Sequence, residues 1–145
     1  ALRMKQHCSN AQRVVDYLTK NKNVERVIYP NLHTGELGDR AKRYFKGGYG
    51  GLVGIEVKGG VEAGKKFIEA LKMFYHVANI GDARSLAIHP ATTTHSQLNQ
   101  EELLAAGVTP GYVRLSIGIE HPDDIIADLD QALSASIKPS LKVVS

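Results

Sequence analysis

The sequence predicts an α+β fold, with a mostly antiparallel sheet and helices packed on one side of it. Two observations lead to this prediction. Apolar residues recur at helical spacing in several stretches, and short alternating or continuous apolar runs lie between those stretches. The chain has 145 residues, a length typical of one domain, so we expect a single unit over residues 1–145.

The first helix is expected from near the start of the chain to about Lys20, because Ala11, Val14 and Leu18 share one face. The remaining elements follow from apolar spacing and from glycine, proline and asparagine stops. They are a strand at 24–29, a helix at about 37–45, a strand at 52–57, a helix whose apolar face includes Phe67, Ile68, Leu71 and Tyr75, strands near 77–80 and 85–89, a helix between Asn99 and Gly107, a strand at 112–119 and a helix from Pro122.

Two of the expected helix starts carry specific signals. Asn99 and Glu102 have the spacing of a capping box, in which each side chain binds the backbone N–H of the other residue. Pro122 is favoured at a first helical position, and Asp123 and Asp124 suit the positive end of the helix dipole. We therefore expect one helix to begin at each of these places.

The composition excludes several classes of protein. Lys and Arg number 18 against 15 Asp and Glu, and the resulting charge of +3 is spread along the chain. We therefore expect no nucleic-acid partner and no membrane partner. The single cysteine, Cys8, excludes an internal disulfide and a Cys-rich zinc module, and it fits a reducing compartment. We expect a cytoplasmic protein.

Two further motifs favour structural interpretations. The glycines of residues 47–51 resemble a phosphate-binding loop, but no Gly-Lys-Ser/Thr follows, and a strand is expected where such a loop requires a helix. We interpret this segment as a turn or bulge that leads into the strand. His89 and His95 match no common metal-ligand spacing, and no cysteine or carboxylate cluster lies near them. No metal ligand is assigned.

Arg114 is the candidate binding residue. It lies in the middle of an alternating strand, on the face opposite Val113 and Leu115, and its neighbours on its own face, Ser116 and Gly118, are small. The room beside the guanidinium suits a planar anion such as a carboxylate, which arginine binds in a bidentate manner. Spacing alone leaves two other interpretations open: an arginine on a solvent face, or one paired with an internal Asp or Glu.

Two long motifs carry a family resemblance. Residues 89–95 (HPATTTH) and 111–120 (GYVRLSIGIE) resemble the C-terminal domain of the Cys/Met-metabolism pyridoxal-phosphate enzymes of fold type I. These enzymes include cystathionine synthases and lyases, methionine gamma-lyase and O-acetylhomoserine sulfhydrylase. Residues 29–32 and 50–60 also resemble the family, so the match covers essentially the whole chain. The resemblance implies the small C-terminal domain of these enzymes.

Within the family, residues 79–83 (NIGDA) and 93–98 (TTHSQL) most resemble the O-acetylhomoserine sulfhydrylase branch, although methionine gamma-lyases share the Gly-Asp pair. This resemblance implies a pyridoxal-phosphate-dependent transferase of methionine biosynthesis that replaces the acetate of O-acetylhomoserine by sulfide to give homocysteine. It also implies a homo-oligomer, which is a tetramer in the family. The alternatives are methionine gamma-lyase, a cystathionine synthase or lyase, and a stand-alone α/β module that binds a small carboxylate.

The resemblance assigns two substrate-binding residues: Arg114, which would hold the α-carboxylate of the amino-acid substrate, and Asn79, which would assist it. The catalytic lysine of the family follows a Ser-x-Ser/Thr motif, and Lys20 is rejected because Asn21 follows it where the family has an aromatic residue. No catalytic or cofactor-binding residue is therefore assigned. We expect a C-terminal fragment that lacks the pyridoxal-phosphate domain and is inactive in isolation.

Overall fold

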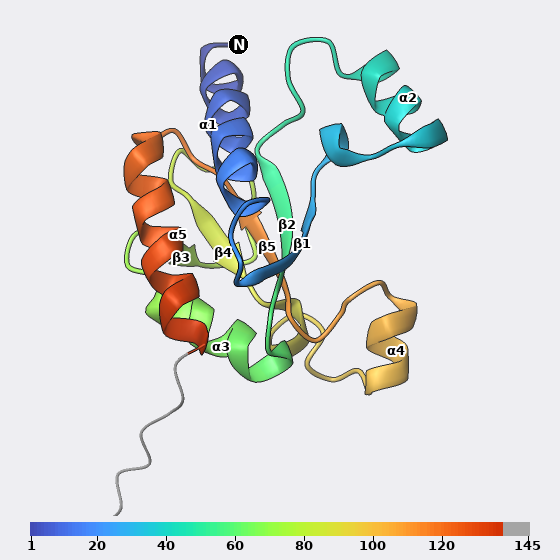
Figure 1. Ribbon diagram of the computed structural model, residues 1–145, viewed down its shortest axis with the longest axis vertical. Helices are drawn as coiled ribbons and strands as arrows, with labels where there is room; N and C mark the ends of the chain where they lie inside the picture. Colours follow the sequence, from blue (N-terminus) through green and yellow to red (C-terminus); the bar gives the residue numbers. More distant parts are fainter. Residues whose placement is uncertain (138–145) are drawn as a thin grey trace, which may run out of the picture.

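The computed structural model describes residues 1–137, and its helices and strands follow the expected order (Figure 1). Residues 138–145, which belong to the expected unit, lie outside the described residues. The described strands form a five-stranded sheet in the order β1-β2-β5-β4-β3. Neighbouring strands are antiparallel except β3 and β4, which are parallel. The strands are β1 (Val24–Ile28), β2 (Leu52–Val57), β3 (Tyr75–His76), β4 (Leu86–Ile88) and β5 (Tyr112–Ser116).

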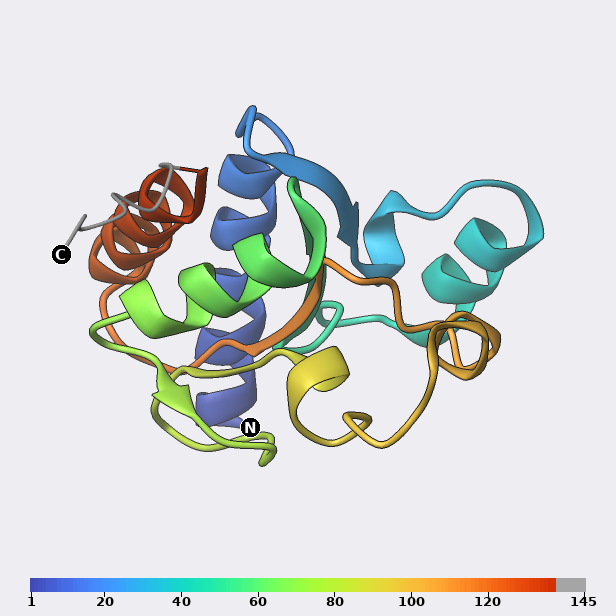
Figure 2. The same ribbon diagram turned by 90° about the horizontal axis from the view of Figure 1, so that it is seen from below.

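Helices cover one face of this sheet and leave the other face open. Figure 2 shows α1 (Leu2–Leu18), α3 (Gly60–Ala70) and α5 (Pro122–Ile137) on one side. The shorter helices α2 (Gly35–Tyr44) and α4 (Gln100–Ala105) project on the opposite side. The prediction of a mostly antiparallel sheet with helices on one side is therefore confirmed. Within residues 1–137, no helix combines the length and the apolar character that a membrane crossing requires.

The core lies between the covered face and the three long helices. Alternate residues of the two central strands point into it, and their side chains are almost completely buried. The helices contribute Leu, Val, Ile and Phe side chains at helical spacing. The principal core residues are Val53, Ile55, Val57, Val113 and Leu115 from the sheet, Ile117 directly after β5, and Val14, Leu18, Phe67, Ile125, Leu129 and Leu133 from the helices.

The first helix is also attached to the sheet by buried polar groups. The ring of His7 lies with its Nδ1 2.6 Å from the carbonyl oxygen of Ile117. The amide of Asn10 donates to the carbonyl oxygens of Gly118 (3.1 Å) and Glu120 (2.8 Å). Both side chains are buried, so these bonds satisfy polar groups that would otherwise be costly in the interior. They fix α1 against the segment that follows β5.

Two element boundaries differ from the sequence prediction. The helix expected to reach Tyr75 ends at Ala70, because the buried carboxylate of Asp128 accepts the backbone N–H groups of residues 72–74 and turns the chain away. The strand expected at 77–80 therefore lies earlier, at Tyr75–His76. The strand expected to reach residue 119 ends at Ser116. Beyond that point the backbone of Gly118 binds the side chains of Ser85 and Asn10 instead of another strand.

The glycine segment before β2 is an irregular connection with bends, and no hydrogen-bonded turn is assigned within residues 47–51. Gly48 and Gly50 have φ angles of +133° and +86°, which favour glycine. A side chain on Gly48 would also place its Cβ 2.6 Å from the Cβ of Cys8. The segment therefore passes tightly over α1 before it enters the sheet.

His89 is held in the interior as a neutral imidazole. Its Nε2 lies 2.8 Å from the carbonyl oxygen of Pro110, which only accepts, so Nε2 carries the proton. Its Nδ1 lies 2.8 Å from the hydroxyl of Thr92 and accepts from it. Gly64 of α3 packs directly against the ring. Burial lowers the pKa of His89 below its ordinary value of 6.5.

We expect acid to destabilise the fold through this histidine. Because its folded-state pKa lies below 6.5, the unfolded chain takes up the proton first as the pH falls. The free energy of unfolding is therefore unaffected by this group above about pH 6.5 and decreases below it. Urea unfolding between about pH 7.5 and pH 5.5 should show this decrease, and His89→Gln should reduce its slope. An unchanged slope in His89→Gln would contradict the assignment.

Candidate functional site

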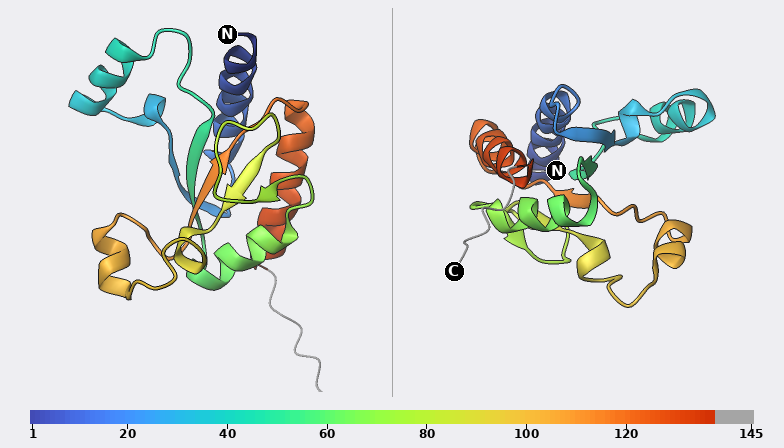
Figure 3. Two further views of the ribbon diagram at one scale, coloured as in Figure 1. Left: turned by 180° about the vertical axis from the view of Figure 1, so that it is seen from behind. Right: turned by 60° about the horizontal axis from the view of Figure 1, so that its bottom comes forward.

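Arg114 lies on the central strand of the sheet and faces the open side. In the strand register it pairs with Gly54 of β2 and with Ile88 of β4. The left view of Figure 3 looks onto this face, where the connection from β3 to β4 also lies. The side chain of Arg114 is half-buried. Its sequence neighbours Val113 and Leu115 point into the core, whereas Arg114 points away from it. The structure therefore places a fixed charge at the centre of the uncovered face.

The guanidinium of Arg114 is bound by backbone groups and not by a carboxylate. Its Nη2 donates to the carbonyl oxygens of Ala78 (2.8 Å) and Asn79 (3.3 Å). Its Nε is enclosed by protein and has no hydrogen-bond partner within residues 1–137. Glu56, an acidic residue on the same face, is engaged by Arg26 (2.6 Å) and by the Thr109 hydroxyl (2.8 Å). The ion-pair interpretation of Arg114 therefore finds no acidic partner among the described residues.

The second predicted site residue, Asn79, contacts Arg114 through its backbone carbonyl oxygen and not through its side chain. The side chain of Asn79 is exposed, and its Oδ1 accepts the N–H of Ile80 at 2.9 Å. The small residue Ser116 was expected to leave open space beside the guanidinium. Instead its hydroxyl binds the N–H of Gly81 at 3.1 Å, and the loop over residues 78–81 occupies that space.

A cavity of about 250 Å³ adjoins Arg114 on the open face. Tyr112, two residues earlier on the same side of β5, lines it together with Tyr29 and His33 from the connection after β1. Burial raises the pKa of the Tyr112 phenol, and the Arg114 charge opposes this rise. The alternation of β5 places Tyr112 on this face, but the sequence gives no signal for the approach of Tyr29 or His33.

A second cavity on the same face is mainly apolar. Its volume is about 420 Å³, and it shares Pro30 and Leu52 with the first cavity. Phe45, Tyr49 and Ile80 also line it. The two cavities meet at these two residues, and we call them together the hollow beside Arg114. They bring a cation and apolar walls to one part of the face, an arrangement common in small-molecule sites.

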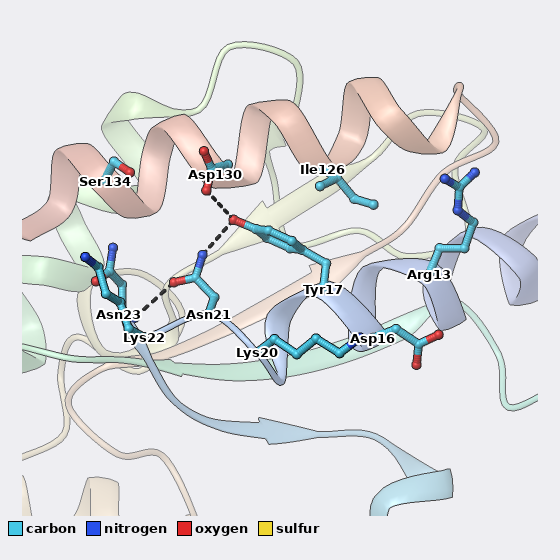
Figure 4. Close-up of a pocket in the computed structure, with 10 residues that line it drawn as sticks. All are labelled: Arg13, Asp16, Tyr17, Lys20, Asn21, Lys22, Asn23, Ile126, Asp130 and Ser134. Atoms are coloured by element: carbon cyan, nitrogen blue, oxygen red, sulfur yellow. Dashed lines mark hydrogen bonds between the residues drawn. The ribbon is translucent and has the colours of Figure 1, made fainter.

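A third cavity, of about 630 Å³, lies between α1 and α5 (Figure 4). Its central polar atoms bind one another. The amide of Asn21 donates to the Tyr17 hydroxyl at 2.6 Å, and that hydroxyl donates to Asp130 at 2.5 Å. Burial and the Asp130 carboxylate raise the pKa of Tyr17. These hydrogen bonds link α1 to α5 and engage the polar groups at the centre of the cavity. We therefore take the hollow beside Arg114 as the candidate site.

Comparisons with known proteins agree with the sequence motifs. The profile of the family described as Cys/Met metabolism PLP-dependent enzyme matches residues 1–134. An O-acetyl-L-homoserine sulfhydrylase of Leptospira meyeri is 54% identical over 91% of this chain, and an L-methionine gamma-lyase of Fusobacterium nucleatum is 46% identical over 91%. A solved structure of a putative O-acetylhomoserine (thiol)-lyase from Campylobacter jejuni, with a pyridoxyl-lysine phosphate, superposes with a TM-score of 0.84 at 41% identity over 92% of this chain and 32% of that chain.

The chain therefore belongs to the Cys/Met-metabolism family of pyridoxal-phosphate-dependent enzymes. It spans 30% of the length of the Leptospira relative and 33% of the Fusobacterium relative. The matched structure, a pyridoxal-phosphate-dependent lyase, confirms the predicted fold.

No lysine lines either cavity of the open face in the part of the chain that the structure describes. Lys20 and Lys22 line the third cavity, between α1 and α5.

We expect Tyr17→Phe to affect stability and not activity. The change removes the hydroxyl that joins α1 to Asp130 of α5. A bond of this kind contributes about 1 kcal/mol to the free energy of unfolding. Urea unfolding and steady-state kinetics of the full-length enzyme would measure both effects. A large loss of kcat/KM in a folded Tyr17→Phe protein would show that this cavity belongs to the active site.

Proposed function

We propose that this chain is the C-terminal, substrate-carboxylate-binding part of a pyridoxal-phosphate-dependent O-acetylhomoserine sulfhydrylase. The observation that carries the proposal is the Arg114 guanidinium, which faces the open side of the sheet with no acidic partner among residues 1–137. A cation of this kind, beside a cavity with apolar walls, is suited to a carboxylate ligand.

The role of this chain is to bind and orient the substrate. Two backbone carbonyls engage Nη2 of Arg114, so the plane of the guanidinium is set before the ligand arrives. The Nη1 donors then meet the α-carboxylate, and the exposed amide of Asn79, on the loop that binds Arg114, assists. When bound, pyridoxal phosphate supplies the electron sink for the reaction. No lysine lines this site among residues 1–137.

Similarity to the sulfhydrylases supports the choice of substrate. The Leptospira sulfhydrylase shares more of the sequence than the Fusobacterium methionine gamma-lyase, at 54% against 46% identity. The expected reaction replaces the acetate of O-acetylhomoserine by sulfide and gives homocysteine. Methionine gamma-lyase activity is the second candidate, because its representatives match over the same part of the chain.

Arg114→Ala in the full-length enzyme should lower kcat/KM for O-acetylhomoserine roughly thirty- to a thousandfold. This corresponds to a loss of about 2–4 kcal/mol of transition-state stabilisation. The change removes a charge-assisted anchor and leaves the carboxylate unpaired. Arg114→Lys should restore part of this loss, because an ammonium keeps the charge but not the planar fork. Steady-state kinetics with varied O-acetylhomoserine measure both values.

A control is Arg40→Ala, which removes an arginine that forms an exposed ion pair with Glu36 within α2. It should leave kcat/KM within about twofold, since surface ion pairs contribute little. Cofactor absorbance should be normal in all three variants. Wild-type kcat/KM in a folded, cofactor-loaded Arg114→Ala enzyme would make Arg114 a structural residue and refute the proposal.

O-acetylhomoserine should be preferred to cystathionine. The residue before Asn79 is Ala78, whose methyl side chain offers no partner for the distal ammonium of cystathionine. A missing charged contact costs roughly 1.5–3 kcal/mol, or about ten- to a hundredfold in kcat/KM. Competition between the two substrates measures the ratio directly. Equal values would refute the specificity, and a higher value for methionine elimination would favour the gamma-lyase assignment.

A further inference from the structure

The loop that holds Arg114 is itself held at one glycine. Gly81 has a φ of +72°, and its peptide groups are bound on both sides. Its N–H donates to the hydroxyl oxygen of Ser116 at 3.1 Å, and its carbonyl oxygen accepts from Nη2 of Arg3 at 2.7 Å. We call this arrangement, formed by Arg3, Gly81 and Ser116, the Gly81 clamp. It joins α1, the loop and the central strand at one point.

The clamp and the substrate anchor lie on the same short loop. Ala78 and Asn79, whose carbonyls bind Arg114, precede Gly81 in sequence by three and two residues, respectively. Ser116 follows Arg114 by two residues on β5, so both side chains leave the strand on the same face. One strand therefore binds the loop twice, through a hydroxyl at one end and through a guanidinium at the other.

The two contacts differ in rigidity. Ser116 is 3% exposed and has a short side chain, so it fixes the Gly81 peptide with little freedom. Arg114 has a long, half-buried side chain, and its orientation depends on where the two carbonyls lie. A displacement of the loop would therefore move the guanidinium while leaving the strand in place.

We propose that Ser116 and Arg3 are positioning residues: by clamping Gly81 they set the two carbonyls that aim the Arg114 guanidinium at the substrate carboxylate. This inference rests on the proposed role of Arg114. Arg3 lines neither cavity of the open face, and Ser116, which lines the apolar one, has its hydroxyl oxygen engaged by the N–H of Gly81. Their effect on substrate binding passes through Arg114, which distinguishes them from residues that only stabilise the fold.

The test is a double-mutant cycle in the full-length, cofactor-loaded enzyme. Ser116→Ala should raise KM for O-acetylhomoserine about five- to tenfold, with kcat within about twofold, because one hydrogen bond that orders the loop is lost. On an Arg114→Ala background the same change should have no further effect on KM. A residue acting through Arg114 loses its influence when that side chain is absent.

Two further variants complete the design. Ser136→Ala removes another buried serine hydroxyl, which donates to Leu133 within α5, and controls for general destabilisation. It should leave KM unchanged. Arg3→Ala removes the exposed half of the clamp and should raise KM about threefold, again only when Arg114 is present. This variant tests the clamp independently if Ser116→Ala does not fold.

The outcomes separate this inference from the proposed function. An unchanged KM in folded Ser116→Ala or Arg3→Ala, alongside a large loss in Arg114→Ala, would overturn the clamp and keep the carboxylate anchor. The same rise in KM with and without Arg114 would also overturn it, because the serine would then act by another route. If Arg114→Ala itself has no effect, the proposed function is what fails.

Discussion

The hydrogen bonding of β5 to strands on both of its edges is the constraint on which the other features depend. Its residues pair with β2 on one side and β4 on the other, so its register is set twice. In that register Val113 and Leu115 enter the core, while Arg114 faces the open side. A slip of one residue would exchange these faces and bury a charge among apolar side chains. Because burying the charge would be costly, the register of the whole sheet determines which face Arg114 occupies.

Much of the fold could be predicted because its signals are local. Helical spacing, strand alternation and the Asn99–Glu102 capping box lie within a few residues of one another, and the structure contains that capping box. The boundaries that differ from prediction depend on groups far apart in sequence. The carboxylate of Asp128 binds backbone N–H groups just after the end of α3, more than fifty residues earlier in the chain. No local sequence pattern indicates that contact.

The candidate site divides in the same way. Alternation alone places Arg114 opposite the core, and the family motif supplies a reason for its charge. The partners of its guanidinium could not be predicted, because they are backbone carbonyls, which every residue possesses. The same holds for the attachment of α1 to Gly118 by Asn10. Sequence patterns identify side chains that carry chemistry, whereas main-chain acceptors become visible only when the chain is folded.

The strand order also has a consequence for how the chain acquires its shape during synthesis. β1 and β2 form an antiparallel pair, β3 and β4 form a parallel pair, and β5 lies between the two pairs although it is the last strand of residues 1–137 to be made. Until residues 112–116 leave the ribosome, the two pairs share no backbone hydrogen bonds across their gap. Their apolar faces remain partly uncovered during that interval, which is when chains of this topology are most exposed to aggregation and to chaperones. Insertion of one late strand completes the sheet and creates the charged centre of its open face in the same event.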